Sequence, residues 1–113
     1  MAYEQIEKRR FPRVPAKVTL NCQIRGIIPE FDNAVSEDIS LGGISFVNKR
    51  FISPQTPVSL KINLFSRVLN TIGRIAWSWP IPHSDRYKVG VEFLELNYSD
   101  KRQLSDFIAL QAA

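Results

Sequence analysis

Cysteine, histidine and long apolar runs are scarce in this sequence. Among 113 residues there is one cysteine, one histidine and one methionine. A single cysteine cannot form a disulfide within the chain and is typical of a reducing compartment. A lone histidine with no cysteine nearby provides no zinc-ligand spacing. No apolar run reaches the ~18 residues of a membrane span. We therefore expect a cytoplasmic protein with no metal, no cofactor and no membrane insertion.

Catalytic constellations are lacking as well. The sequence contains no evident Ser-His-Asp set, no pair of acids beside a histidine, and no glycine-rich loop followed by lysine. Cys22 falls on the apolar face of a predicted strand, which favours a packed thiol over a nucleophile. His83 falls in a predicted loop directly after Pro80 and Pro82, which favours a solvent-exposed histidine. These absences predict that the protein is not an enzyme.

The composition indicates a small folded domain with a mild excess of positive charge. Hydrophobic residues make up 44% of the chain, which is enough for one modest core. Fifteen basic residues against 11 acidic ones give a formal net charge of +4. The sign favours anionic partners, but the magnitude is too small to indicate bulk binding of DNA or RNA.

Apolar residues alternate along most of the chain, which is typical of half-buried strands. The predicted strands cover residues 17–25, 31–39, 43–47, 58–64, 68–79 and 87–94. In the longest of them Gly73 is a predicted bulge, and alternation assigns Gly73, Ile75, Trp77 and Trp79 to one face. The period changes to that of a helix only over residues 98–111, after Asn97 or Ser99 as N-cap. Six short strands and one helix predict a mainly β fold, a six-stranded antiparallel β-barrel with a C-terminal α-helix.

One short stretch, residues 38–43, concentrates polar and flexible residues before an apolar run. Asp38 and Ser40 are two residues apart, so an extended strand would present both side chains on one face. Together they can hold a polar edge such as that of a nucleobase. Gly42 and Gly43 allow a sharp turn and a close approach to the backbone. Taken alone, the same residues also suit an ordinary β-turn.

A second cluster, near the N-terminus, carries Arg9, Arg10 and Arg13. Pro12 and Pro15 disfavour helix before them, so this piece should be extended. Guanidinium groups suit phosphate oxygens and the O6/N7 edge of guanine. We expect residues 1–15 to form a basic arm and residues 16–113 to form the barrel domain. Taken alone, the arginines also suit a solvated basic tail.

The two clusters complement each other chemically. The arm offers cations, and the turn offers an acceptor beside a hydroxyl. An ionised Asp38 can accept the N1–H and N2–H₂ donors of guanine, which adenine does not provide. A ligand that carries both phosphates and guanines would engage both clusters at once.

The spacing Arg9-x-x-x-Arg13 followed by Asp38-x-Ser40-x-x-Gly43 resembles the paired signature of the PilZ domain family. The run from Gly90 to Phe93 is similar to the last strand of that family. The resemblance extends from about Glu7 to Leu110. It implies a six-stranded barrel, split-barrel-like, that binds one or two molecules of the bacterial second messenger cyclic di-GMP.

The resemblance also implies roles for individual residues. Arg9 and Arg13 would grip phosphate and the guanine O6/N7 edge, and Arg10 would add a phosphate contact or stack on a base. Asp38 and Ser40 would bond the guanine edge, while Gly43 would hold the turn and leave room for the base. Three weaker candidates for ligand contact are Gly42, Arg74 and Trp77. Trp77 suits the core as well as it suits stacking on a base.

The predicted function is a cyclic di-GMP receptor or adaptor that orders its N-terminal arm on binding and signals to a protein partner. One alternative is a small barrel that binds nucleic acid, which would need aromatic platforms on an exposed strand face. Another is a PilZ-like module that binds only protein; such members typically lack the arginine pair.

Overall fold

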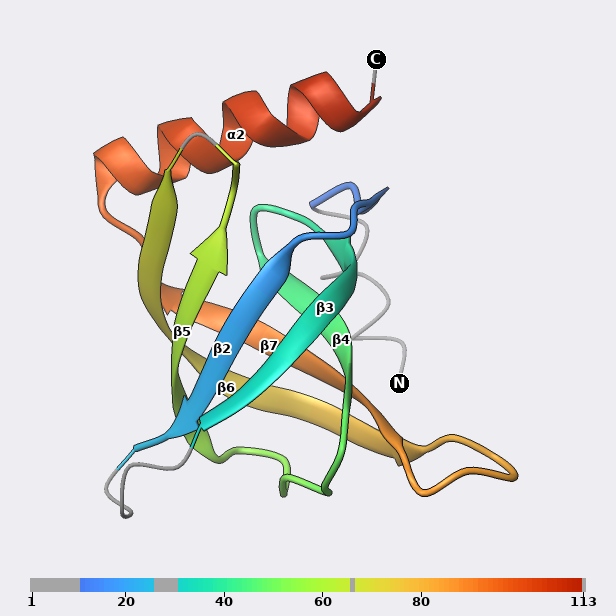
Figure 1. Ribbon diagram of the computed structural model, residues 1–113. Coiled ribbons are helices and arrows are strands. Elements are labelled where there is room, and N and C mark those ends of the chain that lie inside the picture. The colour runs from blue at the N-terminus through green and yellow to red at the C-terminus, as the bar shows by residue number, and fades with distance from the viewer. Residues whose placement is uncertain (1–10, 26–30, 66, 113) are drawn as a thin grey trace.

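The computed structural model describes residues 11–25, 31–65 and 67–112, which form a barrel of antiparallel strands with a helix across one end (Figure 1). Its elements are β1 (Val14–Pro15), β2 (Thr19–Ile24), β3 (Phe31–Ile39), β4 (Gly43–Asn48), β5 (Pro57–Asn63), β6 (Val68–Pro80), β7 (Tyr87–Glu95) and α2 (Tyr98–Ala112). The strand bounds lie within two residues of those predicted by alternation.

Six of these strands close on themselves. The order is β3-β2-β5-β6-β7-β4, and a further pairing between β4 and β3 completes the ring. The short β1 pairs with β3 at Ile39 and Asp38, beyond the residues of β3 that pair with β2. The prediction of a six-stranded antiparallel barrel is confirmed. Closure leaves no open edge in the ring, which protects so small a sheet from edge-to-edge pairing.

The core fills the barrel and continues under the helix. Phe46, Ile75 and Val89 are fully buried from three neighbouring strands. Each such side chain contributes about 1.5–3 kcal/mol on burial. Leu104 and Phe107 of α2 join the same core, so the helix seals the end of the barrel that it crosses in Figure 1.

Local chemistry at the helix start and at the cysteine agrees with the sequence. The Asn97 side-chain carbonyl accepts a hydrogen bond from the Asp100 amide at 2.7 Å, which makes Asn97 the N-cap. Cys22 is buried in the core. Burial, followed by the nearby negative charge of Asp32, raises the pKa of Cys22 to about 12. The prediction of a packed thiol is confirmed, and the raised pKa disfavours the reactive thiolate form.

The ladders of the barrel differ in regularity. The β2–β3, β2–β5 and β5–β6 ladders run without interruption. The β3–β4 ladder shifts register between Ser36 and Asp38, and the β6–β7 ladder shifts twice. Each shift inserts an extra residue and turns the next side chain to the other face.

These shifts correct two predictions for β6. The register changes at Gly73, but the extra residue is Leu94 on β7, because Ile72 pairs with Glu95 and Gly73 with Phe93. A second bulge, at Ala76, separates residues that alternation assigned to one face. Ile75 pairs with Val91, whereas Trp77 pairs with Gly90. Opposite residues share a face, so Ile75 points into the barrel and Trp77 points out.

Candidate functional site

The turn between β3 and β4 is held by its own serine. The Ser40 hydroxyl oxygen accepts hydrogen bonds from the amides of Gly42 at 3.1 Å and Gly43 at 3.2 Å. The Ser40 amide donates to the Gly43 carbonyl at 2.9 Å. The strand ends at Ile39, so Ser40 does not extend beside Asp38 in a strand as predicted. The hydroxyl is buried and fixes the turn, while Asp38 faces outward.

The two glycines of the turn are required for different reasons. A Cβ added to Gly43 would lie 2.2 Å from the backbone carbonyl oxygen of Val91, so only glycine lets β4 approach β7 this closely. A Cβ on Gly42 would come closest to the ring of Phe11, at 2.7 Å from Cδ2. Gly43 is thus explained by strand packing, and Gly42 by a side chain of the arm.

Arg13 is brought to Asp38 by the short strand that follows it. Val14 and Pro15 pair with Ile39 and Asp38, and the Ala16 amide donates to the Glu37 carbonyl at 3.1 Å. Arg13 Nη1 lies 3.5 Å from Asp38 Oδ1, with both side chains partly exposed. One member of each predicted cluster therefore meets the other. Arg9 and Arg10 lie outside the described residues.

A single transverse row crosses four strands on the outside of the barrel. Asp38 of β3 pairs with Ser45 of β4, Ser45 with Gly90 of β7, and Gly90 with Trp77 of β6. The row therefore offers a carboxylate, a hydroxyl, a position without a side chain, and an indole. We call the outer face of β3, β4, β7 and β6 around this row the row face.

Trp77 belongs to the row face and not to the interior of the barrel. A Cβ on Gly90 would lie 2.2 Å from Cε2 of Trp77, so the indole lies directly over the glycine. Trp77 is 8% exposed and stacks on Trp79, with ring centroids 4.5 Å apart and the planes inclined by 23°. Trp79 itself is 55% exposed. Trp77 is therefore the buried member of an aromatic pair on the outside of the barrel.

Sequence reasoning missed Trp79 and Ser45 as neighbours of the predicted site. Ser45 is buried, and no hydrogen-bond partner for its hydroxyl lies among the described residues. Alternation around Ile44 and Phe46 was a signal that Ser45 faces outward. Trp79 gave no such signal, since its face depends on the bulge at Ala76.

Ion pairs border the row face. Arg74 donates to Glu92 at 2.6 Å, and Lys88 lies 3.0 Å from Glu37. Arg74 thus lies on the same outer face as Trp77, two register positions away. Its guanidinium is already engaged by a carboxylate, and both side chains are partly exposed.

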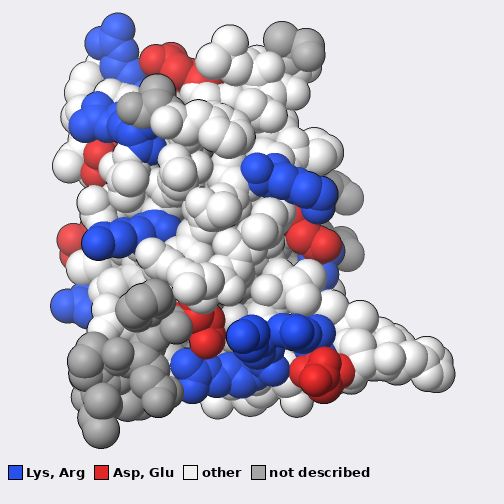
Figure 2. Space-filling model, in the orientation of Figure 1, with Lys and Arg blue, Asp and Glu red and all other residues white. Residues whose placement is uncertain are grey.

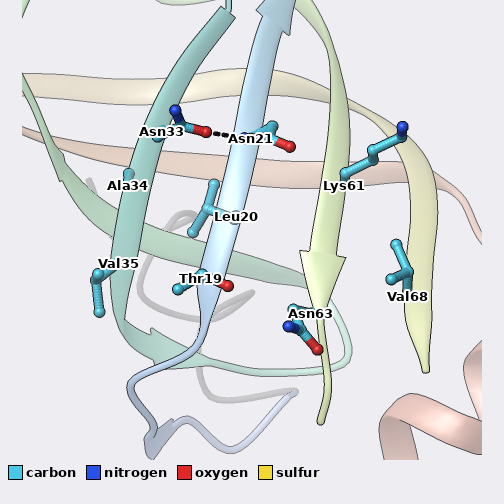
Figure 3. A pocket seen from close by; sticks show the side chains of 9 residues that line it. All are labelled: Thr19, Leu20, Asn21, Asn33, Ala34, Val35, Lys61, Asn63 and Val68. Carbon is cyan, nitrogen blue, oxygen red and sulfur yellow. Dashed lines mark hydrogen bonds between the residues drawn. The ribbon is translucent and has the colours of Figure 1, made fainter. Parts of the chain in front are cut away.

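The surface formed by β2, β5 and residues 33–35 of β3, at the other end of β3 from Asp38, has a different character. Positive and negative side chains are interspersed over it, with uncharged surface between them (Figure 2). Figure 3 shows a shallow groove there, lined by Thr19, Asn21, Asn33, Val35, Lys61, Asn63 and neighbours. None of the predicted site residues lines this groove.

Within the described parts of the chain, no group of three or more His, Cys, Asp or Glu side chains could hold a metal ion. No helix in those parts is long and apolar enough to cross a bilayer.

Comparison with known proteins identifies a family and several solved structures with the same fold. Residues 7–110 match the family described as PilZ domain. No curated protein matches the sequence. The inhibitor of motility from Bacillus subtilis, MotI (DgrA), is similar with a TM-score of 0.77 and 24% identity, over 93% of this chain and 51% of that one.

Two other solved structures with this fold are named with a ligand. The PilZ domain of YcgR from Escherichia coli with c-di-GMP has a TM-score of 0.75 and 15% identity, over 93% of this chain and 92% of that one. The MrkH–c-di-GMP complex from K. pneumonia has a TM-score of 0.72 and 19% identity, over 89% of this chain and 51% of that one. The chain thus spans about half the length of MotI and MrkH.

Proposed function

The chain belongs to the PilZ domain family, and from this we propose that it is a receptor for cyclic di-GMP, which binds on the row face. The observation that carries the proposal is the approach of Arg13 to Asp38 at 3.5 Å. These residues come from two clusters that are far apart in the sequence, and each suits a different part of a guanine nucleotide. Two similar structures are named as containing the same ligand, which supports the proposal.

The Arg13–Asp38 pair is suited to exchange for a ligand. The side chains are 37% and 27% exposed, and a pair of this kind contributes only about 0–1 kcal/mol. A guanine can take the Asp38 carboxylate through N1–H and N2–H₂, while the Arg13 guanidinium turns to phosphate or to O6/N7. Charge-assisted bonds to the ligand, at about 1.5–3 kcal/mol each, outweigh the pair that is lost.

The remaining residues have distinct proposed roles. Arg9 and Arg10 bind phosphate from the arm. Ser40 and Gly43 hold the turn that presents Asp38, so they act on the ligand through its shape. Trp77 supports the exposed Trp79 from below, and the pair provides a stacking surface for a base, worth about 1–3 kcal/mol. Gly42 and Arg74 are secondary, since one seats Phe11 and the other is paired with Glu92.

The finer part of the proposal concerns signalling. The part of the arm that carries Arg9 and Arg10 closes over the row face when these arginines meet the phosphates, and the altered surface is recognised by a protein partner. The ligand is the second messenger, and the barrel is its fixed platform.

Isothermal titration with cyclic di-GMP tests the proposal, using Arg9→Ala, Arg13→Ala and Asp38→Ala. Each should weaken binding by about 1.5–3 kcal/mol, roughly 10- to 150-fold. Lys61→Ala is the matched control, because Lys61 is an exposed cation on β5 away from the row face. Unchanged affinity in all three site variants would reject the site.

Cyclic di-AMP and a single-stranded oligonucleotide complete the test. Neither should compete, because adenine lacks the donors for Asp38 and a polymer binder would show affinity spread along a strand. Equal binding of the oligonucleotide would instead favour a nucleic-acid-binding barrel.

A further inference from the structure

The arm contacts the turn through a residue that lies between its arginines. Phe11 is two residues after Arg9 and two before Arg13. Its ring lies over Gly42, where a Cβ would come within 2.7, 3.3 and 3.4 Å of three of its carbons. We infer that Phe11 is a positioning residue: its ring, seated on Gly42, fixes the arm so that Arg13 meets Asp38. This inference rests on the proposed function and concerns the same site.

The seat is part of a shallow groove beside the turn. Phe11 lines the groove together with Leu41, Phe93, Leu94 and Leu96, where β7 leads into α2. The ring is 37% exposed, so nearly two thirds of Phe11 is covered. Apolar walls on one side and a glycine beneath give a flat aromatic side chain a defined place to pack.

The chain between the seat and Arg13 has little freedom. Pro12 follows Phe11 directly and fixes its own φ, and it also restricts Phe11 to extended conformations. On the other side of Arg13, Val14 is held in the β1–β3 ladder. Arg13 is thus suspended between a seated ring and a paired strand.

Both anchors lead to one rigid element. Gly42 is held by the Ser40 hydroxyl at 3.1 Å, and Val14 pairs with Ile39, the residue next to Asp38. The same short turn therefore determines the positions of Phe11, Arg13 and Asp38.

A side chain on Gly42 should displace the ring without unfolding the barrel. The nearest atoms to an added Cβ all belong to the Phe11 side chain and not to backbone. Gly42→Ala and Phe11→Ala therefore remove the same contact from opposite sides. If the contact positions the arm, the second substitution should cost nothing once the first has been made.

Titration with cyclic di-GMP measures this coupling. Phe11→Ala and Gly42→Ala should each weaken binding roughly 2- to 12-fold, the cost of ordering one more side chain on binding. The double variant should be no weaker than Phe11→Ala, and Phe11→Tyr should restore the wild-type affinity. Phe51→Ala is the control, since Phe51 is another partly exposed phenylalanine and its ring centroid lies 5.8 Å from that of Tyr87, away from the turn. Additive losses, or Phe11→Ala with unchanged affinity, would overturn the inference.

A measurement without ligand separates this inference from the proposed function. In the free protein, NMR relaxation of the Arg13 Nε–Hε group should report greater motion in Phe11→Ala and Gly42→Ala than in the wild type. Phe51→Ala should show the same Arg13 motion as the wild type. If the wild type does not bind cyclic di-GMP, the proposed function fails, but this measurement still tests whether Phe11 positions Arg13. Unchanged Arg13 motion in both Phe11→Ala and Gly42→Ala would reject the inference that Phe11 positions Arg13, whether or not the protein binds cyclic di-GMP.

Discussion

The two halves of this barrel differ in how regularly their strands pair. On β2 and β5 the ladders are continuous, and the outer positions carry residues such as Asn21, Ser59 and Lys61. On the row face, the regular β4–β7 pair is flanked on each side by a bulged ladder. Bulges are enriched next to functional sites because they re-aim side chains. Here one bulge turns Asp38 outward and another turns Trp77 outward.

The bulge beside Asp38 is stabilised from both sides of the sheet. Ser36 points inward, where its hydroxyl donates to the Ala16 carbonyl at 2.5 Å and accepts from the Val18 amide at 3.0 Å. The extra residue, Glu37, faces Lys88 at 3.0 Å. Without the extra residue, Asp38 would share the inward face of Ser36. The orientation of the proposed ligand carboxylate is therefore a property of the ladder.

The two aspartates of β3 repeat the contrast. Asp32 accepts hydrogen bonds from Arg50 Nε and Nη2, both at 3.0 Å, and from Asn48 at 3.1 Å. Asp38 has one longer approach, 3.5 Å from Arg13. A carboxylate that is already bonded on both oxygens serves structure, whereas one that is lightly engaged can be taken by a ligand.

Gly43→Ala should have the largest effect on stability, because it changes the tightly packed row face. The added Cβ meets the Val91 carbonyl, which cannot move without parting β4 from β7, so we expect a loss of about 1–3 kcal/mol in unfolding free energy. Urea unfolding measures it, with Ser59→Ala on the regular half as the control, expected within about 0.5 kcal/mol. Equal, small losses in both variants would mean that the row face is no more tightly constrained than the other half.

Gly90→Ala should have an intermediate effect that is confined to the row face. The Cβ would overlap the Trp77 indole, which must leave its place over β7 at a cost of about 1–2 kcal/mol. Tryptophan fluorescence should shift to the red as the indole enters water, and affinity for cyclic di-GMP should fall. Trp79→Phe provides the control for fluorescence from the second indole. An unshifted spectrum with full affinity would show that Trp77 does not depend on Gly90.

Asp32→Asn should have the smallest effect, a slight loss of stability near neutral pH that disappears in acid. Burial raises the pKa of Asp32, but the hydrogen bonds from Arg50 and Asn48 outweigh it, so the pKa lies below its ordinary value. Folding thus favours the carboxylate. This contribution is present above the unfolded pKa of about 3.9 and is lost as pH falls through the lower folded value.

Thermal unfolding between about pH 2 and 6 measures this effect. Asp32→Asn should flatten the acid limb by no more than about 1 kcal/mol, because Arg50 is partly exposed. Binding of cyclic di-GMP at neutral pH should be unaltered. A large loss of affinity in this variant would erase the distinction between the two aspartates.

The sequence by itself determined the class of fold and most of its elements. Alternation located all six barrel strands, and the change of period located α2 with Asn97 or Ser99 as its N-cap, of which the structure selects Asn97. The motif that links Arg9 and Arg13 to Asp38, Ser40 and Gly43 indicated the family. Patterns of this kind are local, so they can be recognised without knowing which strands are neighbours.

The tertiary structure alone decided which way the site residues face. Alternation assigned Trp77 to the same face as Ile75 and Ser40 to the same face as Asp38, and the structure separates both pairs. A bulge at Ala76 turned the indole outward, and the end of β3 at Ile39 committed the Ser40 hydroxyl to the turn. The physical reason is that a bulge arises from the fit between two paired strands, and one extra residue reverses every side chain beyond it.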